Sequence, residues 1–310
     1  MDTQLIDTVT RMVLEKMDSP ASGMVKVWDH VVESSQAVES SQAESKSIPL
    51  PQKQAKELER ELPPLTTRLG VEKPISADLL SELVTKTPAR IGIGRAGVRP
   101  KTETWLRFRL DHAAAVDAVY GEVAQELLDS LGFFSVETLV RDKEEYIRRP
   151  DLGRRLSEEA KRLIRERCTS QPLVQIIVSD GLSSQAIEKN VEDVYFSLQQ
   201  SLQQLGLQQG TPFFINKGRV AVMDEVGELL EPEAIVLLIG ERPGLMSAES
   251  LSAYLCYKPR KGTIEAERMV ISNIHEGGIP PVEAGAYLGN LVQKILKYKA
   301  SGIALVQKGG

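Results

Sequence analysis

Between residues 171 and 305, short apolar runs alternate with longer runs in which apolar residues recur every three or four positions. Three of the short runs read LVQIIVSDGLSS, PFFINKGRV and AIVLLIGERPG, and each passes from apolar residues into a glycine-containing loop. The helical runs cover Ala186–Leu205, Met223–Leu230 and Pro281–Lys299, and weaker strand patterns cover Leu255–Tyr257 and Arg268–Ser272. Alternating strands and helices are typical of right-handed βαβ units, because parallel neighbours need a crossover connection. The sequence therefore predicts an α/β fold, with a Rossmann-like, mainly parallel sheet over residues 171–305.

Residues 56–170 show helical periodicity instead. The clearest predicted helix spans His112–Leu131. Its apolar residues recur at the spacing of one helix face: Ala113, Val116, Val119, Val123 and Leu127. No alternating apolar pattern indicates a strand before residue 170, so we expect a helical N-terminal subdomain over residues 56–170.

The first 55 residues differ from the rest of the chain in composition. Residues 1–17 place most of their apolar side chains on one helical face: Leu5, Ile6, Val9, Val13 and Met17. Residues 18–55 are rich in serine, glutamine and glutamate, and the hexamer VESSQA occurs twice in tandem. Such a composition cannot bury enough apolar surface to offset the entropy of ordering. We expect an amphipathic helix over residues 1–17, followed by a flexible linker over residues 18–55.

Charge and composition exclude several classes of protein. The formal net charge is −5 at pH 7, whereas a dedicated nucleic-acid binder is usually strongly basic. Cys168 and Cys256 are far apart and no CxxC occurs, which disfavours a zinc ribbon, an iron–sulfur ferredoxin and a disulfide scaffold. No apolar run approaches the roughly 20 residues that cross a bilayer, and Asp2 and Asp7 lie where a secretory signal carries positive charge. We expect an intracellular protein that binds neither nucleic acid nor membrane.

A GxGxxG motif lies at Gly92, Gly94 and Gly97. A dinucleotide-binding fingerprint of this form must follow a strand and open a helix. Here Pro88 precedes the motif closely, and Pro100 stands where the helix would begin. The motif leaves two interpretations open, a nicotinamide-binding oxidoreductase or a glycine-rich loop that packs closely or contacts an anion.

The three histidines form no site by spacing. His275 lies in a glycine-rich loop after a predicted strand, but no second ligand is near it in sequence, so we predict no metal site. The GxSxG and HExxH templates of hydrolases do not occur.

Four polar or glycine-rich loops follow predicted strands, at residues 180–184, 216–220, 240–244 and 272–278. In an open α/β sheet, ligands bind in the crevice outside the carboxyl ends of the strands. Glu241 follows the most apolar strand and offers a carboxylate to the amide or hydroxyl donors of a ligand, while Val220 offers backbone groups and an apolar wall. A purely structural role for Glu241, pairing with Arg242 or capping a helix, stays open. The pattern predicts a sizeable polar ligand at the strand ends.

Five stretches carry a resemblance to a known family: PARIGIGRAGVRPKTETWLRFRLDHAAAVDAV, IIVSDGLSS, GTPFFINKGRVAV, VGELLEPEAIVLLIGERPGLMSAESLSAYLCYKPR and ISNIHEGGIPPVEAGAYLGNLVQKILKYKASGI. They cover residues 88–305 almost continuously and resemble the small subunit of ethanolamine ammonia-lyase. The resemblance implies a bacterial adenosylcobalamin enzyme that converts ethanolamine to acetaldehyde and ammonia by a radical rearrangement. It also implies a large-subunit partner that binds the substrate, with the cobalamin between the two chains.

The same resemblance implies which residues contact the cofactor. Two of the family's three cobalamin-associated positions match here as Val220 and Glu241. The third is commonly a cysteine, and Val270 stands in its place, so only a backbone or packing contact would survive there. We expect no catalytic acid, base or nucleophile on this chain, since the radical chemistry belongs to the cofactor. The DxHxxG motif that supplies a histidine to cobalt in many cobalamin proteins does not occur.

Residues 1–17 also resemble the family's extension, a short amphipathic helix that directs the enzyme into a protein-shelled microcompartment. We therefore expect a location in the bacterial cytoplasm, inside an ethanolamine-utilisation microcompartment. A frayed terminus or a self-association helix is the alternative interpretation of this segment. A non-catalytic scaffold protein of such a compartment is the alternative interpretation of the chain.

Overall fold

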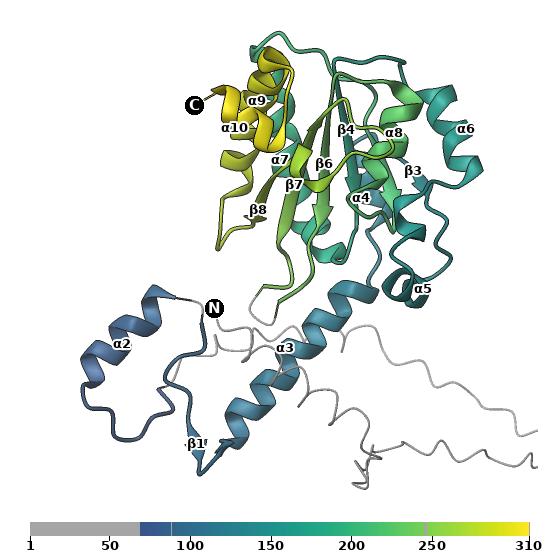
Figure 1. Cartoon of the computed structure of the whole chain (residues 1–310). Coiled ribbons are helices and arrows are strands. Elements are labelled where there is room, and N and C mark those ends of the chain that lie inside the picture. Colours follow the sequence, from purple (N-terminus) through teal and green to yellow (C-terminus); the bar gives the residue numbers. More distant parts are fainter. Residues whose placement is uncertain (1–68, 88, 245–246, 310) are drawn as a thin grey trace, which may run out of the picture. The chain divides into compact units, whose positions relative to one another are not determined.

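A computed structural model of the chain describes residues 69–87, 89–244 and 247–309 (Figure 1). Residues 65–310 belong to one compact unit. The helix and linker predicted over residues 1–17 and 18–55 lie outside the described residues. None of the described helices combines the length and the apolar character that crossing a bilayer requires.

The helices and strands alternate along most of the described chain. The helices are α2 (Ala77–Lys86), α3 (Thr102–Tyr120), α4 (Gln125–Ser130), α5 (Lys143–Arg148), α6 (Glu158–Arg167), α7 (Ser184–Gln204), α8 (Val222–Leu230), α9 (Pro281–Tyr298) and α10 (Gly302–Gly309). The strands are β1 (Arg95–Ala96), β2 (Arg99–Pro100), β3 (Phe134–Glu137), β4 (Val174–Ser179), β5 (Phe213–Asn216), β6 (Ala234–Gly240), β7 (Leu251–Tyr257) and β8 (Arg268–Ile274). Short 3₁₀ turns cover Leu152–Arg154 and Glu265–Glu267.

Six of these strands form one sheet in the order β3-β5-β4-β6-β7-β8. Strands β3, β5, β4 and β6 are parallel, and β7 and β8 add two antiparallel pairings at one side. All residues of β4 and β6 are buried, as expected for strands covered on both faces by helices. The predicted α/β fold with a mainly parallel sheet is confirmed.

Strands β1, β2 and β3 correct the prediction that no strand precedes residue 170, and β3 belongs to the main sheet. It pairs in parallel with β5, from Phe134 opposite Phe213 to Glu137 opposite Asn216. The strand has four residues, of which only Val136 is buried. A strand this short at the edge of a sheet carries too few alternating positions for periodicity to reveal it.

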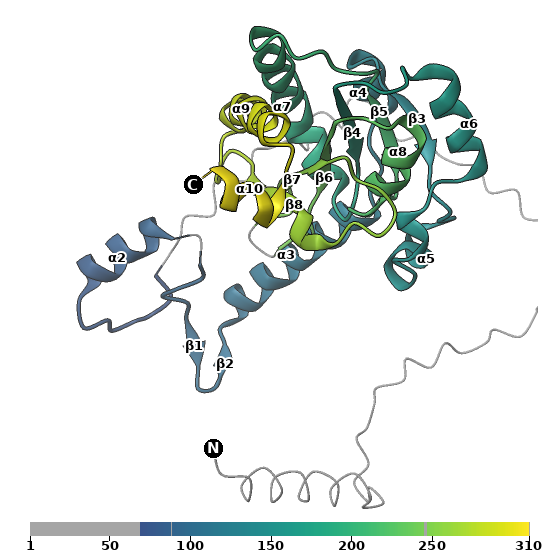
Figure 2. The ribbon, with the colours of Figure 1, turned by 45° about the horizontal axis from the view of Figure 1, so that its top comes forward.

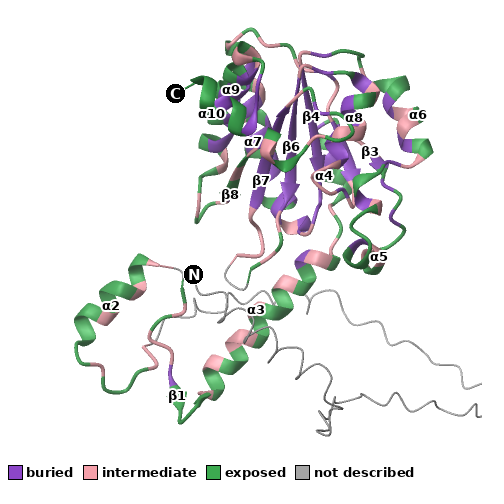
Figure 3. Cartoon of the chain, in the orientation of Figure 1, coloured by how far each residue is buried: buried purple, intermediate pink, exposed green. Residues whose placement is uncertain are grey.

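Helices cover the two faces of the sheet as separate layers (Figures 1 and 2). On one face, α7 and α9 pack with α4 and α10 over the side chains of Ile176, Val178 and Val236. On the other face, α6 and α8 pack over Ile177 and Ile235. Figure 3 shows the strands as the most continuously buried part of the chain. The sheet is therefore the rigid element from which the loops at its edges are positioned.

Helices α7 and α9 approach each other closely at glycine positions. A Cβ atom on Gly285 of α9 would lie 2.5 Å from the Val194 carbonyl oxygen and 2.7 Å from Cβ of Ser197, both on α7. These are backbone and near-backbone atoms, which cannot move aside as the end of a flexible side chain can. The packing of the two helices therefore requires glycine at position 285.

We expect Gly285→Ala to destabilise the chain, although alanine is the better helix former. Overpacking a tight contact costs about 1–3 kcal/mol, which exceeds the gain of about 1 kcal/mol in helix propensity. Urea unfolding of the purified variant measures the sign. Asn290→Ala, at an exposed position of the same helix, is the matched control and should be neutral or slightly stabilising. A Gly285→Ala variant as stable as the control would contradict the close approach.

Candidate functional site

The carboxyl ends of the parallel strands meet at one edge of the sheet, and the predicted loops meet there with them. The loops that begin at Asp180, Lys217 and Glu241 follow β4, β5 and β6 directly. Strand β7 begins at the same edge, since Leu251 pairs with Gly240, and β8 ends there, since Ile274 pairs with Leu251. We call this edge, with its loops, the carboxyl edge.

A cavity of about 1120 Å³ lies at the carboxyl edge, beside β6, β7 and β8. This volume is slightly above the range of roughly 300–1,000 Å³ that small-molecule sites usually occupy, so the cavity suits a large ligand. The residues that line it are Glu241, Arg242, Gly244, Ser247, Glu249, Ser250, Tyr254, Val270, Ser272, Asn273, His275, Glu276 and Gly277. Two of the three predicted cofactor residues, Glu241 and Val270, are in this lining.

Glu241, in the cavity lining, is held by β7 and by the residue before that strand. Its backbone N–H donates to the Ser250 carbonyl at 2.9 Å, and its Oε1 accepts from the Tyr254 hydroxyl at 3.3 Å. Burial, and then the neighbouring Glu241 carboxylate, raises the pKa of Tyr254 to about 12. Within the described residues, no ion pair joins Glu241 to Arg242. The carboxylate therefore lies at the cavity with a tyrosine as its partner.

Val270 lies across from Tyr254 in the β7–β8 ladder, and its side chain is 45% exposed. It offers the cavity an apolar surface beside the Glu241–Tyr254 pair. Further along the chain, Asn273 and His275 also line the cavity. Asn273 has a positive φ of 62°, and its Oδ1 lies 2.9 Å from Nε2 of His275.

His275 forms its hydrogen bonds within its own loop. Its Nδ1 accepts from the Gly277 N–H at 3.2 Å, which leaves Nε2 to donate to Asn273. In the part of the chain that the structure describes, no group of three or more His, Cys, Asp and Glu side chains is placed to hold a metal ion. The loop is instead a source of hydrogen-bonding groups at the cavity.

Val220 lies at the same edge but not in the cavity wall. It follows β5, which is separated from β6 by β4, and it packs against the core on the α6–α8 face. The structure therefore brings Glu241 and Val270 together and places Val220 on the other side of the β4 loop.

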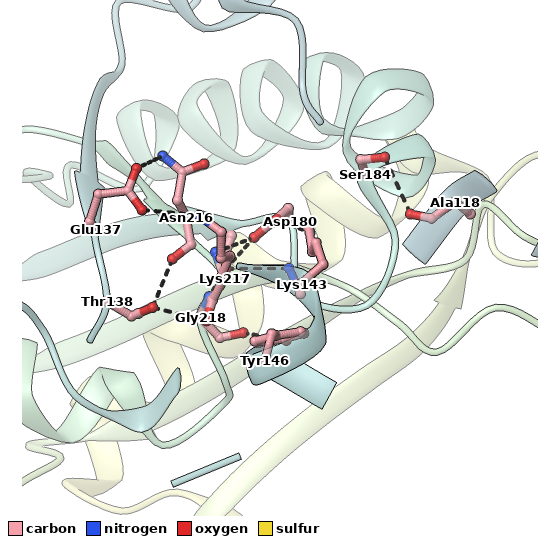
Figure 4. Close-up of polar contacts among 12 residues, drawn as sticks. Ala118, Glu137, Thr138, Lys143, Tyr146, Asp180, Ser184, Asn216, Lys217 and Gly218 are labelled. Atoms are coloured by element: carbon pink, nitrogen blue, oxygen red, sulfur yellow. Dashed lines mark hydrogen bonds and ion pairs between the residues drawn. The ribbon is translucent and has the colours of Figure 1, made fainter. Parts of the chain in front are cut away.

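A buried polar cluster joins the β4 and β5 loops (Figure 4). Asp180, only 4% exposed, accepts from the Lys217 N–H at 2.6 Å and pairs with Lys143 of α5 at 2.5 Å. The Tyr146 hydroxyl, also from α5, donates to the Gly218 carbonyl at 2.8 Å. Burial raises the pKa of Tyr146, so its hydroxyl stays a donor well into alkaline pH. We call Lys143, Tyr146, Asp180, Lys217 and Gly218 the Asp180 cluster.

Sequence reasoning missed several of the cavity residues and the two members of the Asp180 cluster that come from α5, Lys143 and Tyr146. The other three members lie in the strand-end loops predicted at residues 180–184 and 216–220. Ser247 and Tyr254 belong to no motif. The sequence predicted only the last three residues of β7, and only a prediction of the whole strand would have placed Tyr254 beside Glu241. Lys143 and Asp180 are 37 residues apart and meet only because α5 lies over the carboxyl edge. The run GERPG and the loop 272–278, by contrast, contained a usable signal, because each follows a strand.

The GxGxxG motif lacks the structural context of a dinucleotide site. Gly92 precedes the hairpin formed by β1 and β2, two strands of two residues each, in which Arg95 pairs with Pro100. Gly97 lies in the turn of this hairpin. The motif follows no strand of the main sheet, and α3 begins only after Pro100. The nicotinamide interpretation thus loses its structural basis, because no helix N-terminus follows a sheet strand at these glycines.

The fold and the cavity define a class of protein: an α/β protein with a large, polar-lined cavity at the carboxyl edge of its sheet. Comparison with known proteins narrows the class. Residues 77–306 match the model of the ethanolamine ammonia-lyase light chain family. The chain is 51% identical over 238 residues to the ethanolamine ammonia-lyase small subunit of Clostridium perfringens, which covers 77% of this chain and 81% of that protein. It is 52% identical over 221 residues to the protein of the same name from Lachnoclostridium phytofermentans, covering 71% of this chain and 75% of that protein. The chain belongs to the ethanolamine ammonia-lyase light chain family.

The Tyr254–Glu241 contact leads to a prediction about stability and pH. Tyr254→Phe should cost about 1 kcal/mol at pH 7, the net worth of one hydrogen bond. The folded chain keeps the phenolic proton up to pH about 12, whereas the unfolded chain releases it near pH 10. The advantage of the wild type over Tyr254→Phe is therefore constant below pH 10 and shrinks as the pH rises above it.

Urea unfolding at pH 7, 9 and 10.5 measures this difference. Tyr287→Phe, an exposed tyrosine on α9 outside the cavity, is the control and should change stability at pH 7 by less than about 0.5 kcal/mol. A Tyr254→Phe variant whose deficit grows between pH 9 and 10.5 would contradict the raised pKa.

Proposed function

We propose that this chain is the small subunit of an adenosylcobalamin-dependent ethanolamine ammonia-lyase, which converts ethanolamine to acetaldehyde and ammonia. The observation that carries the proposal is the family match over residues 77–306, in a chain that has a cavity of about 1120 Å³ with Glu241 in its wall. The proposed partner is the large subunit, which binds the substrate. In the complex, this chain closes over a cobalamin that lies between the two subunits.

The residues at the cavity fit such a cofactor. Cobalamin is a wide macrocycle with amide side chains at its rim, so its site needs a large opening and several hydrogen-bonding groups. The cavity has the volume, and Glu241, Asn273 and His275 supply acceptors and donors. The Ser247 hydroxyl at the cavity is buried and has no hydrogen-bond partner among the described residues, so it remains able to bind a ligand amide.

Each side chain has a limited role in this proposal. The Glu241 carboxylate would accept from an amide N–H of the cofactor, with Tyr254 fixing the orientation of the carboxylate. Val270 would pack against an apolar part of the macrocycle, and Val220 would contribute backbone groups and an apolar wall from the β5 loop. When bound, the cofactor supplies the radical chemistry. The chain supplies binding, orientation and exclusion of water, and we assign it no catalytic acid, base or nucleophile.

The first test is reconstitution. The full chain is mixed with its large-subunit partner and adenosylcobalamin, and the release of acetaldehyde and ammonia from ethanolamine is measured. We expect turnover only when both chains and the cofactor are present, because the site is divided between the subunits. Activity of the large subunit alone, equal to that of the mixture, would leave the alternative of a non-catalytic scaffold in a microcompartment.

We further propose that residues 1–17 direct the complex to a protein shell, inside a microcompartment of the bacterial cytoplasm. The support is the sequence pattern, in which Leu5, Val9 and Val13 lie on one face of a potential helix. An isolated helix of this length is marginal in water, so an apolar face of this kind needs a groove to dock on.

Deleting residues 1–17 should leave turnover of the reconstituted complex unchanged, within about twofold, and abolish its co-purification with shells. The segment precedes the matched family region by some sixty residues, so the deletion removes none of the residues given above as the lining of the cavity. The matched control replaces Asp7 and Thr10, on the polar side, by alanine and should retain shell association. A deletion variant that loses activity would show that the segment is structural.

A further inference from the structure

The β5 loop that leads to Val220 has a backbone conformation that its own residues disfavour. Lys217 has a positive φ of 57°, a left-handed conformation that a lysine rarely adopts. At Gly218 a Cβ atom would lie 2.7 Å from the Ser179 hydroxyl oxygen, so the loop touches the end of β4. Contacts from outside the loop must therefore hold it in place.

The Asp180 cluster supplies those contacts (Figure 4). The Asp180 carboxylate accepts the Lys217 N–H at 2.6 Å, and the Ser179 hydroxyl accepts the Gly218 N–H at 3.0 Å. The Tyr146 hydroxyl donates to the Gly218 carbonyl. The Arg219 guanidinium then stacks over the Tyr146 ring, 4.0 Å from its centroid. Each of the three residues before Val220 is thus tied to α5 or to the end of β4.

The same turn that begins with Asp180 also supports the other side of the site. The Leu182 N–H donates to the Gly240 carbonyl at 3.0 Å, directly before Glu241. The Ser183 hydroxyl donates to the Ala248 carbonyl at 2.6 Å, in the segment that forms the cavity wall. The turn after β4 therefore lies between the loop that carries Val220 and the loop that carries Glu241, and it touches both.

The turn holds its place through a buried ion pair. The side chains of Lys143 and Asp180 are 11% and 5% exposed, and they are 2.5 Å apart. Removing one member of such a pair leaves an uncompensated buried charge, which disrupts the local structure more strongly than removing both. Neither residue lines the cavity, so neither is placed to contact the ligand itself.

From these contacts we propose that Lys143 and Asp180 are positioning residues, which fix the Val220 loop and the Glu241 loop relative to each other for cobalamin binding. The inference rests on the proposed function, because it assigns the pair a role in holding that cofactor. It adds one residue on α5 and one in the turn after β4 to the three predicted cofactor residues.

The test uses the full-length chain in complex with the large subunit. The variants are Lys143→Met, Asp180→Asn, their double variant and the charge-keeping Lys143→Arg. Affinity for cyanocobalamin is measured by equilibrium dialysis, and the order of the loops by hydrogen exchange in peptides that span residues 213–222 and 240–250. For each variant, the concentration of adenosylcobalamin that gives half-maximal activity and the maximal rate are both measured and compared with those of the wild type.

Each single variant should bind cyanocobalamin at least about tenfold more weakly, a change of about 1.4 kcal/mol. In the absence of cofactor, hydrogen exchange should be faster in both peptides than in the wild type. The concentration of adenosylcobalamin for half-maximal activity should rise, while the maximal rate should change less. The double variant should recover part of the affinity, because no buried charge is left and the amide oxygen introduced by Asp180→Asn can still accept the Lys217 N–H. Lys143→Arg should stay closest to the wild type. The double variant also serves if a single variant fails to fold.

Leu202→Ala is the control for loss of stability alone. Leu202 is buried near the far end of α7, about 27 Å of helix from the turn that begins with Asp180. Its variant should unfold at a lower temperature and yet bind cyanocobalamin within about twofold of the wild type. Glu241→Ala is the positive control for lost affinity.

Three results would contradict the positioning role, and the third would also contradict the proposed function. Unchanged affinity in folded Lys143→Met and Asp180→Asn complexes would overturn the positioning role alone. If Leu202→Ala lowered the affinity for cyanocobalamin as much as the variants of Lys143 and Asp180 do, the ion pair would contribute only to stability, and the positioning role would again be overturned. A wild-type complex that binds no cobalamin would overturn the proposed function, and this inference with it.

Discussion

The pairing of β6 with β4 on one side and β7 on the other is the constraint on which the candidate site depends. All seven residues of β6 are buried, and they pair continuously with β7 from Ala234 opposite Tyr257 to Gly240 opposite Leu251. Here the sheet changes from parallel to antiparallel. A parallel strand would have needed a crossover helix after β6, whereas an antiparallel one returns through a loop at the same edge. That loop and the returning strand form the cavity wall, so Glu241 and Tyr254 come together as a consequence of strand direction.

How much of this could be predicted from the sequence depended on how local the signal was. The runs that became β4, β5 and β6 were recognisable because strands covered on both faces are continuously apolar. Glu241 was recognisable because it follows such a run directly. Strand β3 was not, since its four residues include one buried position, and β7 was predicted only in its last residues because Ser252 and Tyr254 interrupt the apolar pattern.

The site residues that the sequence did not indicate depend on distant pairing. Tyr254 reaches Glu241 only in the β6–β7 register, and it lies outside every loop that the sequence placed at the strand ends. Lys143 lies in the highly charged run RDKEEYIRR, and nothing in this run indicates that the lysine is buried beside Asp180. Side chains that meet only through tertiary structure produce no periodic pattern in the sequence, so their contacts can be identified only once the fold is known.

A buried ion pair at the carboxyl edge is an inefficient way to gain stability, because desolvating two charges offsets most of their attraction. An apolar pair of similar size would stabilise the core at least as well, but it could not accept a backbone N–H. Asp180 does accept one, from Lys217 in its left-handed conformation, while Lys143 balances the charge. The pair is therefore better explained by the geometry that it imposes on the two neighbouring loops than by its net contribution to folding. Geometry that is fixed in advance favours binding, because a cavity wall that ordered only on binding would lose part of a ligand's affinity to its own ordering.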